Sequence, residues 1–183
     1  MSVTEWSMEE RRWDMTLVGQ TVLEVRMRLP KLVGDGRAAD RMRRHYQRLE
    51  RLWTAYARRE LYLYACLELA RKQEQGRRFR PWQGRLEGRI SWQQGGIVGM
   101  EWTWWERRGF CQPESQRWGD AWNAEAGHVC LLRAFAPHKR WAEHWLRTRS
   151  DGEKLERIQT FFPDGDGLHM IDRRGREGIV RIS

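Results

Sequence analysis

Hydrophobic residues recur along this chain with two different periods. Residues 21–29, TVLEVRMRL, are rich in β-branched and apolar side chains that partly alternate, which predicts a strand ending at Pro30. From residue 37 to about 75 the spacing changes to three and four, which predicts one long helix with a break or bend within its roughly 55 Å. Its apolar face comprises Met42, Tyr46, Leu49, Trp53, Tyr56, Leu63, Leu67 and Ala70.

Residues 88–109, GRISWQQGGIVGMEWTWWERRG, return to a period of two and predict a hairpin that turns at Gly95 and Gly96. The alternation places Trp92, Trp102 and Trp104 on the face that packs against the helix. Trp105 falls on the opposite face and is expected to be more exposed. The sequence therefore favours a buried role for three of these tryptophans over an aromatic binding surface.

The remaining pattern predicts shorter elements. They are a strand at 118–123, one or two short helices in 131–149, a hairpin around the Gly-Asp-Gly loop in 157–172, and an edge strand at 178–183. The predicted fold class is α+β, a mostly antiparallel sheet with one long helix packed on it, in the order β-α-β-β-β-α-β-β-β. We expect a single domain over residues 1–183, with residues 1–14 as a loosely held N-terminal segment.

Composition narrows the class of protein. With 40% hydrophobic and 32% charged residues, the chain is typical of a folded soluble domain. No apolar run approaches the length of a membrane span, and the N-terminus lacks the apolar core of a signal peptide. As it stands the sequence predicts a cytoplasmic protein, and an extracytoplasmic one if a leader was trimmed. Partner identity and oligomeric state are left open.

Known catalytic and metal-binding motifs are missing from the sequence. The three cysteines are widely spaced, and the five histidines form no H-E-x-x-H pair. The DGDG stretch at 164–167 fails as a calcium loop because His169 occupies the position that needs glycine. We therefore expect no catalytic centre, no metal and no cofactor. An enzyme whose site is assembled from residues far apart in sequence is left open.

Basic charge is concentrated on the predicted helix. Residues 37–80 hold thirteen Arg or Lys and five Asp or Glu, a net charge of +8 out of +9 for the chain. At helical spacing, five of the arginines form a stripe that we take as the candidate binding site: Arg37, Arg41, Arg44, Arg48 and Arg51. The alternatives are a solvated helix face and a site for an anionic polymer, either nucleic acid or a wall polyanion. Trp105 would then add stacking.

In the order of its elements the chain resembles a family of bacterial domains of unknown function. That family includes the extracytoplasmic, lysozyme-binding domain of the anti-sigma factor RsiV and a domain of peptidoglycan deacetylases. The similar stretches are LEVRMRLPKL, GRISWQQGGIVGMEWTWWE, WNAEAGHVCLLRAF and FFPDGDGLHMI. The Gly-Gly-Ala-His sequence and the Pro-Pro-Tyr tail of the family are missing here. The resemblance implies the family's fold and a non-catalytic binding or sensing role, for which a protein ligand is one candidate partner.

Overall fold

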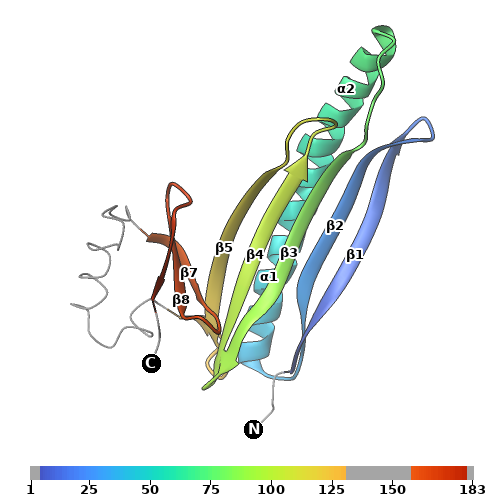
Figure 1. The fold of residues 1–183 in the computed structure, drawn as a ribbon. Coiled ribbons are helices and arrows are strands. Elements are labelled where there is room, and N and C mark those ends of the chain that lie inside the picture. The colour runs from blue at the N-terminus through green and yellow to red at the C-terminus, as the bar shows by residue number, and fades with distance from the viewer. Residues whose placement is uncertain (1–4, 131–157, 181–183) are drawn as a thin grey trace.

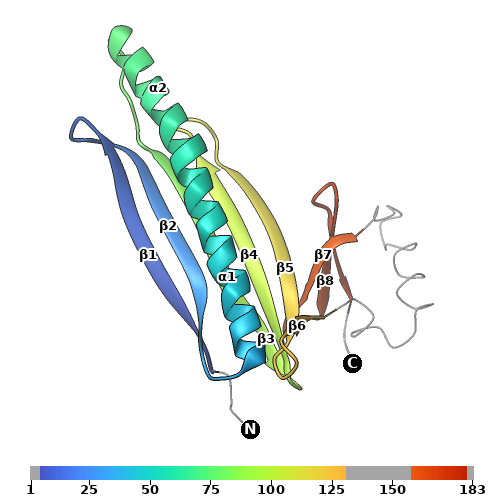
Figure 2. The same cartoon turned by 180° about the vertical axis from the view of Figure 1, so that it is seen from behind.

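One long helix lies lengthwise along a twisted sheet (Figure 1, Figure 2). The computed structural model describes residues 5–130 and 158–180. The main sheet has six strands in chain order: β1 (Glu5–Leu17), β2 (Gln20–Val33), β3 (Trp82–Gln94), β4 (Ile97–Arg107), β5 (Glu114–Asn123) and β6 (His128–Val129). Only β2 and β3 pair in parallel, because the helix between them returns the chain to the starting end of the sheet. The predicted α+β class is confirmed.

The helix has three continuous parts, α1 (Arg37–Tyr56), the π-helical turn η1 (Ala57–Leu61) and α2 (Tyr62–Glu74). The π turn is the irregularity that the length of the helix predicted. It accommodates one extra residue, so the buried face after Trp53 continues through Ala57, Leu61, Ala65 and Leu69. The prediction that Leu63 and Leu67 lie on that face was wrong, since their side chains are 54% and 66% exposed.

The β1–β2 hairpin differs from the sequence-based predictions in two respects. Residues 5–17 form β1, which pairs with β2 along its whole length, and are not a loosely held segment. Pro30 does not end β2 but lies within it, opposite Met8. The pairing of β2 with β3 stops at Arg28, so the missing N–H of Pro30 leaves no bond to β3 unmade.

The β3–β4 hairpin turns at Gly95 and Gly96, both with positive φ, as predicted. Trp102 is fully buried under the helix, and Trp104 is partly buried on the same face. The prediction for Trp92 was wrong. A bulge between Ile90 and Trp92 shifts the register, so Trp92 lies opposite Gly99 on the face away from the helix.

A second sheet contains β7 (Ile158–Pro163), β8 (Leu168–Asp172) and β9 (Glu177–Val180). It packs on the side of the main sheet away from the helix. There Gly99 and Gly119 leave room for Pro163 and Phe162. The predicted hairpin around the Gly-Asp-Gly loop is the β7–β8 pair. The helices predicted within 131–149 lie outside the described residues.

Candidate functional site

The five arginines of the predicted stripe form one ridge along the outer side of α1. All five side chains are exposed, and none forms an ion pair with another residue of the described segments. At 1.5 Å per residue the ridge is about 20 Å long. The two acids of α1 are used elsewhere, since Asp40 lies 3.4 Å from Arg43 and Glu50 pairs with Arg11.

The positive field of the ridge acts on a neighbouring side chain. Burial is the main reason why the pKa of His45 lies below its ordinary value, and the charge on Arg48 is the second. The imidazole lies between Arg48 and the aromatic core, with its ring 5.1 Å from that of Trp122. Such a field is the property that would attract an anion to this side of the helix.

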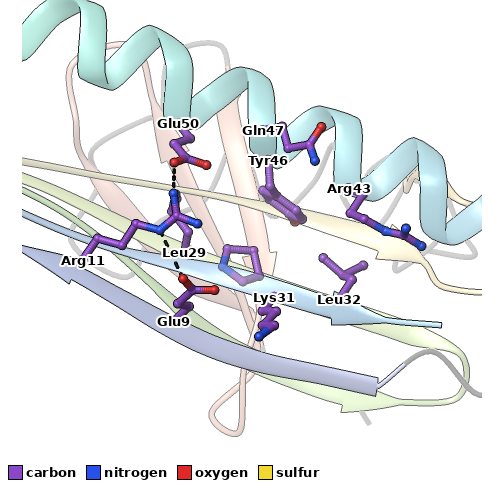
Figure 3. Close-up of a pocket in the computed structure, with 10 residues that line it drawn as sticks. Glu9, Arg11, Leu29, Lys31, Leu32, Arg43, Tyr46, Gln47 and Glu50 are labelled. Atoms are coloured by element: carbon purple, nitrogen blue, oxygen red, sulfur yellow. Dashed lines mark hydrogen bonds and ion pairs between the residues drawn. The ribbon is translucent and has the colours of Figure 1, made fainter.

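On the β1–β2 side of α1 the charges are neutralised within the protein. Figure 3 shows a cavity of about 270 Å³ there, with Arg11 reaching from β1 toward α1. The guanidinium of Arg11 lies 3.2 Å from Glu9 and also pairs with Glu50. Arg43 donates to the carbonyl of Gly34 at 2.6 Å. The pair of Arg11 and Glu50 ties the helix to the first hairpin.

On the opposite, β5 side of α1 lies an open apolar groove. Its volume is about 410 Å³, and Gln116 is the polar residue among those that line it. In Figure 2 the helix lies over the middle of the sheet, and β5 runs beside it. The lining residues are Leu49, Leu52, Trp53, Tyr56, Leu86, Trp104, Gln116 and Trp118. The hydrophobic pattern of the sequence does not predict this groove, because Leu52 lies off the apolar stripe of the helix.

Trp105 is separated from the ridge by the thickness of the sheet. It pairs with Arg85 across β3 and β4 and points away from the helix. The guanidinium of Arg85 lies 4.4 Å from the centre of the indole, and that of Arg107 lies 5.8 Å from it. The structure therefore brings the five arginines together and places Trp105 on the other face.

A largely buried carboxylate, Asp120, links the helix to β4 and β5. It accepts hydrogen bonds from the Tyr46 hydroxyl at 3.1 Å and from the indole N–H groups of Trp102 at 3.3 Å and Trp122 at 3.1 Å. Burial raises the pKa of Asp120 to about 6, although the three donors act in the opposite direction. A carboxyl group with this pKa could exchange protons near neutrality. Its hydrogen-bonding positions are occupied by the protein, which is the arrangement of a structural group.

Two further buried titratable groups are likewise held by neighbours. Glu106 accepts from the Tyr56 hydroxyl and from Arg108 Nε, both at 2.8 Å. His169 lies between Asp164 and Glu177, with nitrogen–oxygen distances of 2.7 and 2.5 Å. Over residues 5–130 and 158–180, no three His, Cys, Asp or Glu side chains gather where they could hold a metal. No helix of the same residues is long and apolar enough to cross a membrane.

The fold defines a class, an α+β domain in which a long helix lies on a mostly antiparallel sheet, and a solved structure shares it. The chain is similar to the crystal structure of a DUF3298 family member from Bacteroides fragilis, with a TM-score of 0.69 and 9% identity over 98% of this chain and 91% of that one. A DUF3298 family protein from Pseudomonas aeruginosa aligns with a TM-score of 0.46 and 15% identity, over 98% and 89% of the chains. No family model and no curated protein matches. The first likeness shows a shared fold with a domain of unknown function.

Proposed function

We propose that this chain is a non-catalytic binding domain that captures an anionic partner on the arginine ridge of α1. The observation that carries the proposal is the group of five exposed guanidinium groups within about 20 Å, without ion-pair partners in the described residues. Arg11 and Arg43, which lie on the β1–β2 side of the helix, are instead paired with acids.

The ridge also carries an energetic cost in the absence of a partner. Like charges spaced three or four residues apart on a helix destabilise it by roughly 0.2–0.5 kcal/mol per pair. The sequence Arg37, Arg41, Arg44, Arg48 and Arg51 contains four such steps. A bound anion would relieve this repulsion, so binding and stability of α1 would be coupled.

A sensing role follows from the sequence resemblance to the family that includes the RsiV domain, and it remains part of the proposal. The partner could be nucleic acid, a wall polyanion or an acidic protein surface, since each presents closely spaced negative charges. The non-catalytic part of the proposal is supported by Asp120 and Glu106, whose carboxylates are hydrogen-bonded to neighbouring side chains.

The proposal is tested by titrating the protein with single-stranded DNA, duplex DNA and polyglutamate at about 50 and 200 mM salt. We expect salt-sensitive binding to at least one of these anions. The double reversal Arg44→Glu, Arg48→Glu should weaken it and flatten its dependence on salt. The matched control is Arg77→Glu, Arg78→Glu, which changes the same charge in the exposed turn after α2.

The two double variants distinguish binding at the ridge from attraction by the net charge of the whole protein. If both weaken binding equally, the net charge of +9 attracts the anions and the ridge is not a site. If none of the three anions binds, or if the ridge variant binds as well as wild type, the proposed function is wrong. Circular dichroism of each variant verifies that α1 is retained.

A further inference from the structure

The apolar groove between α1 and β5 is open to solvent although its lining is aromatic and aliphatic. Leu52, on its helix wall, is 59% exposed. On the sheet side Trp118 is half-buried and stacks on Trp102 with 6.3 Å between ring centroids. Contiguous apolar surface of this kind is a feature of interaction sites.

The groove and the arginine ridge are adjacent on the same helix. With 100° between successive residues, the side chains that follow one another around α1 are Leu49, then Tyr56 and Leu52, then Arg41 and Arg48. Arg48, one turn before Leu52, therefore borders the groove on the helix side, and the ridge continues from it toward the start of α1. The rim of the groove on β5 carries the uncharged Gln116.

An occupant must match an apolar floor and a positive rim together. We propose that the groove and the ridge receive an acidic amphipathic segment of a partner protein, an inference that rests on the proposed function above. Apolar side chains of the segment enter the groove, and its carboxylates face the guanidinium groups. Leu49, Leu52 and Tyr56 extend over two turns, about 10 Å, which fits two or three anchoring side chains.

Charge and shape disfavour other occupants. A second copy of this chain would bring another net charge of +9 to the same face. Duplex nucleic acid would neutralise the ridge but has no apolar groups to place against Leu52 and Trp118. A single strand could stack bases on the half-buried indole of Trp118. Single-stranded DNA therefore serves as a competing probe in the test.

The experiment compares two labelled peptides of about twelve residues and a single-stranded DNA of similar charge. The amphipathic peptide has Leu at helical i, i+3, i+4 and i+7 positions with Glu elsewhere, and the polar peptide has Ser in place of each Leu. Both carry the same charge. We expect the amphipathic peptide to bind about tenfold or more tightly than the polar one, because burial of a Leu side chain contributes a factor of that size.

Two groove variants have matched controls. Leu52→Ser removes an anchor contact, and Leu67→Ser makes the same change at an exposed site on α2. Gln116→Glu places a negative charge at the groove. Ser115→Glu places the same charge on the preceding residue of β5, whose side chain faces away from the helix. We expect Leu52→Ser and Gln116→Glu to weaken binding of the amphipathic peptide several-fold. Both control variants should bind it as wild type does.

The outcomes distinguish the two proposals. Equal, salt-sensitive binding of both peptides, reduced by Arg44→Glu, Arg48→Glu but not by Leu52→Ser, would sustain the proposed function and overturn this inference. Preference for the single-stranded DNA over the amphipathic peptide would also overturn it. Binding of none of the anions would overturn both proposals.

Discussion

Asp120 is largely buried, and its carboxylate is surrounded by the side chains of Tyr46, Trp102 and Trp122. Its pKa is raised to about 6 from an ordinary value of 3.8, so folding favours the protonated form. A group of this kind contributes stability that is fully present below about pH 4 and is lost as the pH rises through about 6. Raising the pKa of Asp120 from 3.8 to about 6 corresponds to about 3 kcal/mol of stability.

The variant Asp120→Asn should therefore remove a pH dependence. We expect the difference in unfolding free energy between wild type and variant to change by about 2–3 kcal/mol between pH 4 and pH 7, with wild type relatively more stable at pH 4. Denaturant titrations at several pH values measure it. The comparison is made in a His45→Gln background, because the imidazole of His45 lies 3.8 Å from Asp120 and is itself a titratable group. A difference independent of pH would contradict the prediction.

Trp102 is the largest fully buried side chain. It packs beside Tyr46 and Trp118 and donates its N–H to Asp120. We expect Trp102→Ala to lower the unfolding free energy by about 3–5 kcal/mol, because it creates a cavity and removes a donor from a buried acid. Trp105→Ala, on the far face under Arg85, is the control and should cost clearly less. Similar denaturation midpoints for the two variants would show that the assignment of faces is wrong.

Among the elements, the π turn η1 explains why the sequence predicted the helix but not its second half. Period-3.6 reasoning extrapolates the face of Trp53 through Tyr56 to Leu63, whereas the extra residue in η1 moves the buried face to Leu61. A one-residue insertion leaves no compositional signal. Strand β1 was not predicted because its sequence shows no single period of two. Its apolar residues have even numbers at Trp6 and odd numbers from Trp13 onward, with charged residues between the two groups.

If η1 contains one residue more than an α-helix needs, deleting one exposed residue from it should be tolerated. We expect deletion of Arg59 to leave Leu61 and the rest of the buried face of α2 in register, with the unfolding free energy within about 1 kcal/mol of wild type. Deletion of Gln47, exposed in regular α1, should rotate Trp53 out of the core and cost about 3 kcal/mol or more. Thermal and chemical denaturation of both deletions compares them, and equal losses would contradict the prediction.

The ridge on α1 can be observed through His45 without a ligand. The charge on Arg48 contributes to the lowered pKa of this imidazole, after burial. We expect Arg48→Glu to raise the pKa of His45, because an anion at that position favours the imidazolium. Arg44→Glu is the control and should raise it less. Proton NMR titration of the imidazole gives both values, and an unchanged pKa in Arg48→Glu would place the guanidinium away from the ring.

The groove and the face on which Trp92 lies could not be predicted from the sequence. The arginine ridge follows from helical spacing alone, and the structure places its five members as predicted. The groove arises because α1 does not cover the part of β5 that contains Gln116 and Trp118. This depends on the distance between α1 and β5, which the hydrophobic pattern does not contain. A bulge at Ser91 places Trp92 on the opposite face from the predicted one, and no residue type at this position is characteristic of a bulge.

At the scale of the whole molecule, the two sheets are joined by close backbone approach and by one chain of charges. Glu101 of β4 accepts from Arg89 Nε at 2.7 Å and from Arg117 Nε at 2.8 Å. Arg117 also donates to Glu177 of β9 at 2.8 Å. These pairings outweigh the effect of burial and hold the pKa of Glu101 below its ordinary value. Its contribution to stability is therefore present above about pH 4.5 and lost on acidification, opposite in sign to that of Asp120.

Gly119 allows this contact between sheets, because a Cβ atom there would overlap Phe162 of β7. Its N–H also donates to Thr160 Oγ1 at 2.9 Å. We expect Gly119→Ala to separate the second sheet from the first, so that amide exchange accelerates in β8 while β3 and β4 remain protected. Gly165→Ala, at a turn with no atom near the added methyl group, is the control and should leave exchange unchanged. Loss of protection in β3 together with β8 would mean that the two sheets unfold as one cooperative unit. Unchanged protection in β8 would mean that the joint does not depend on this close approach.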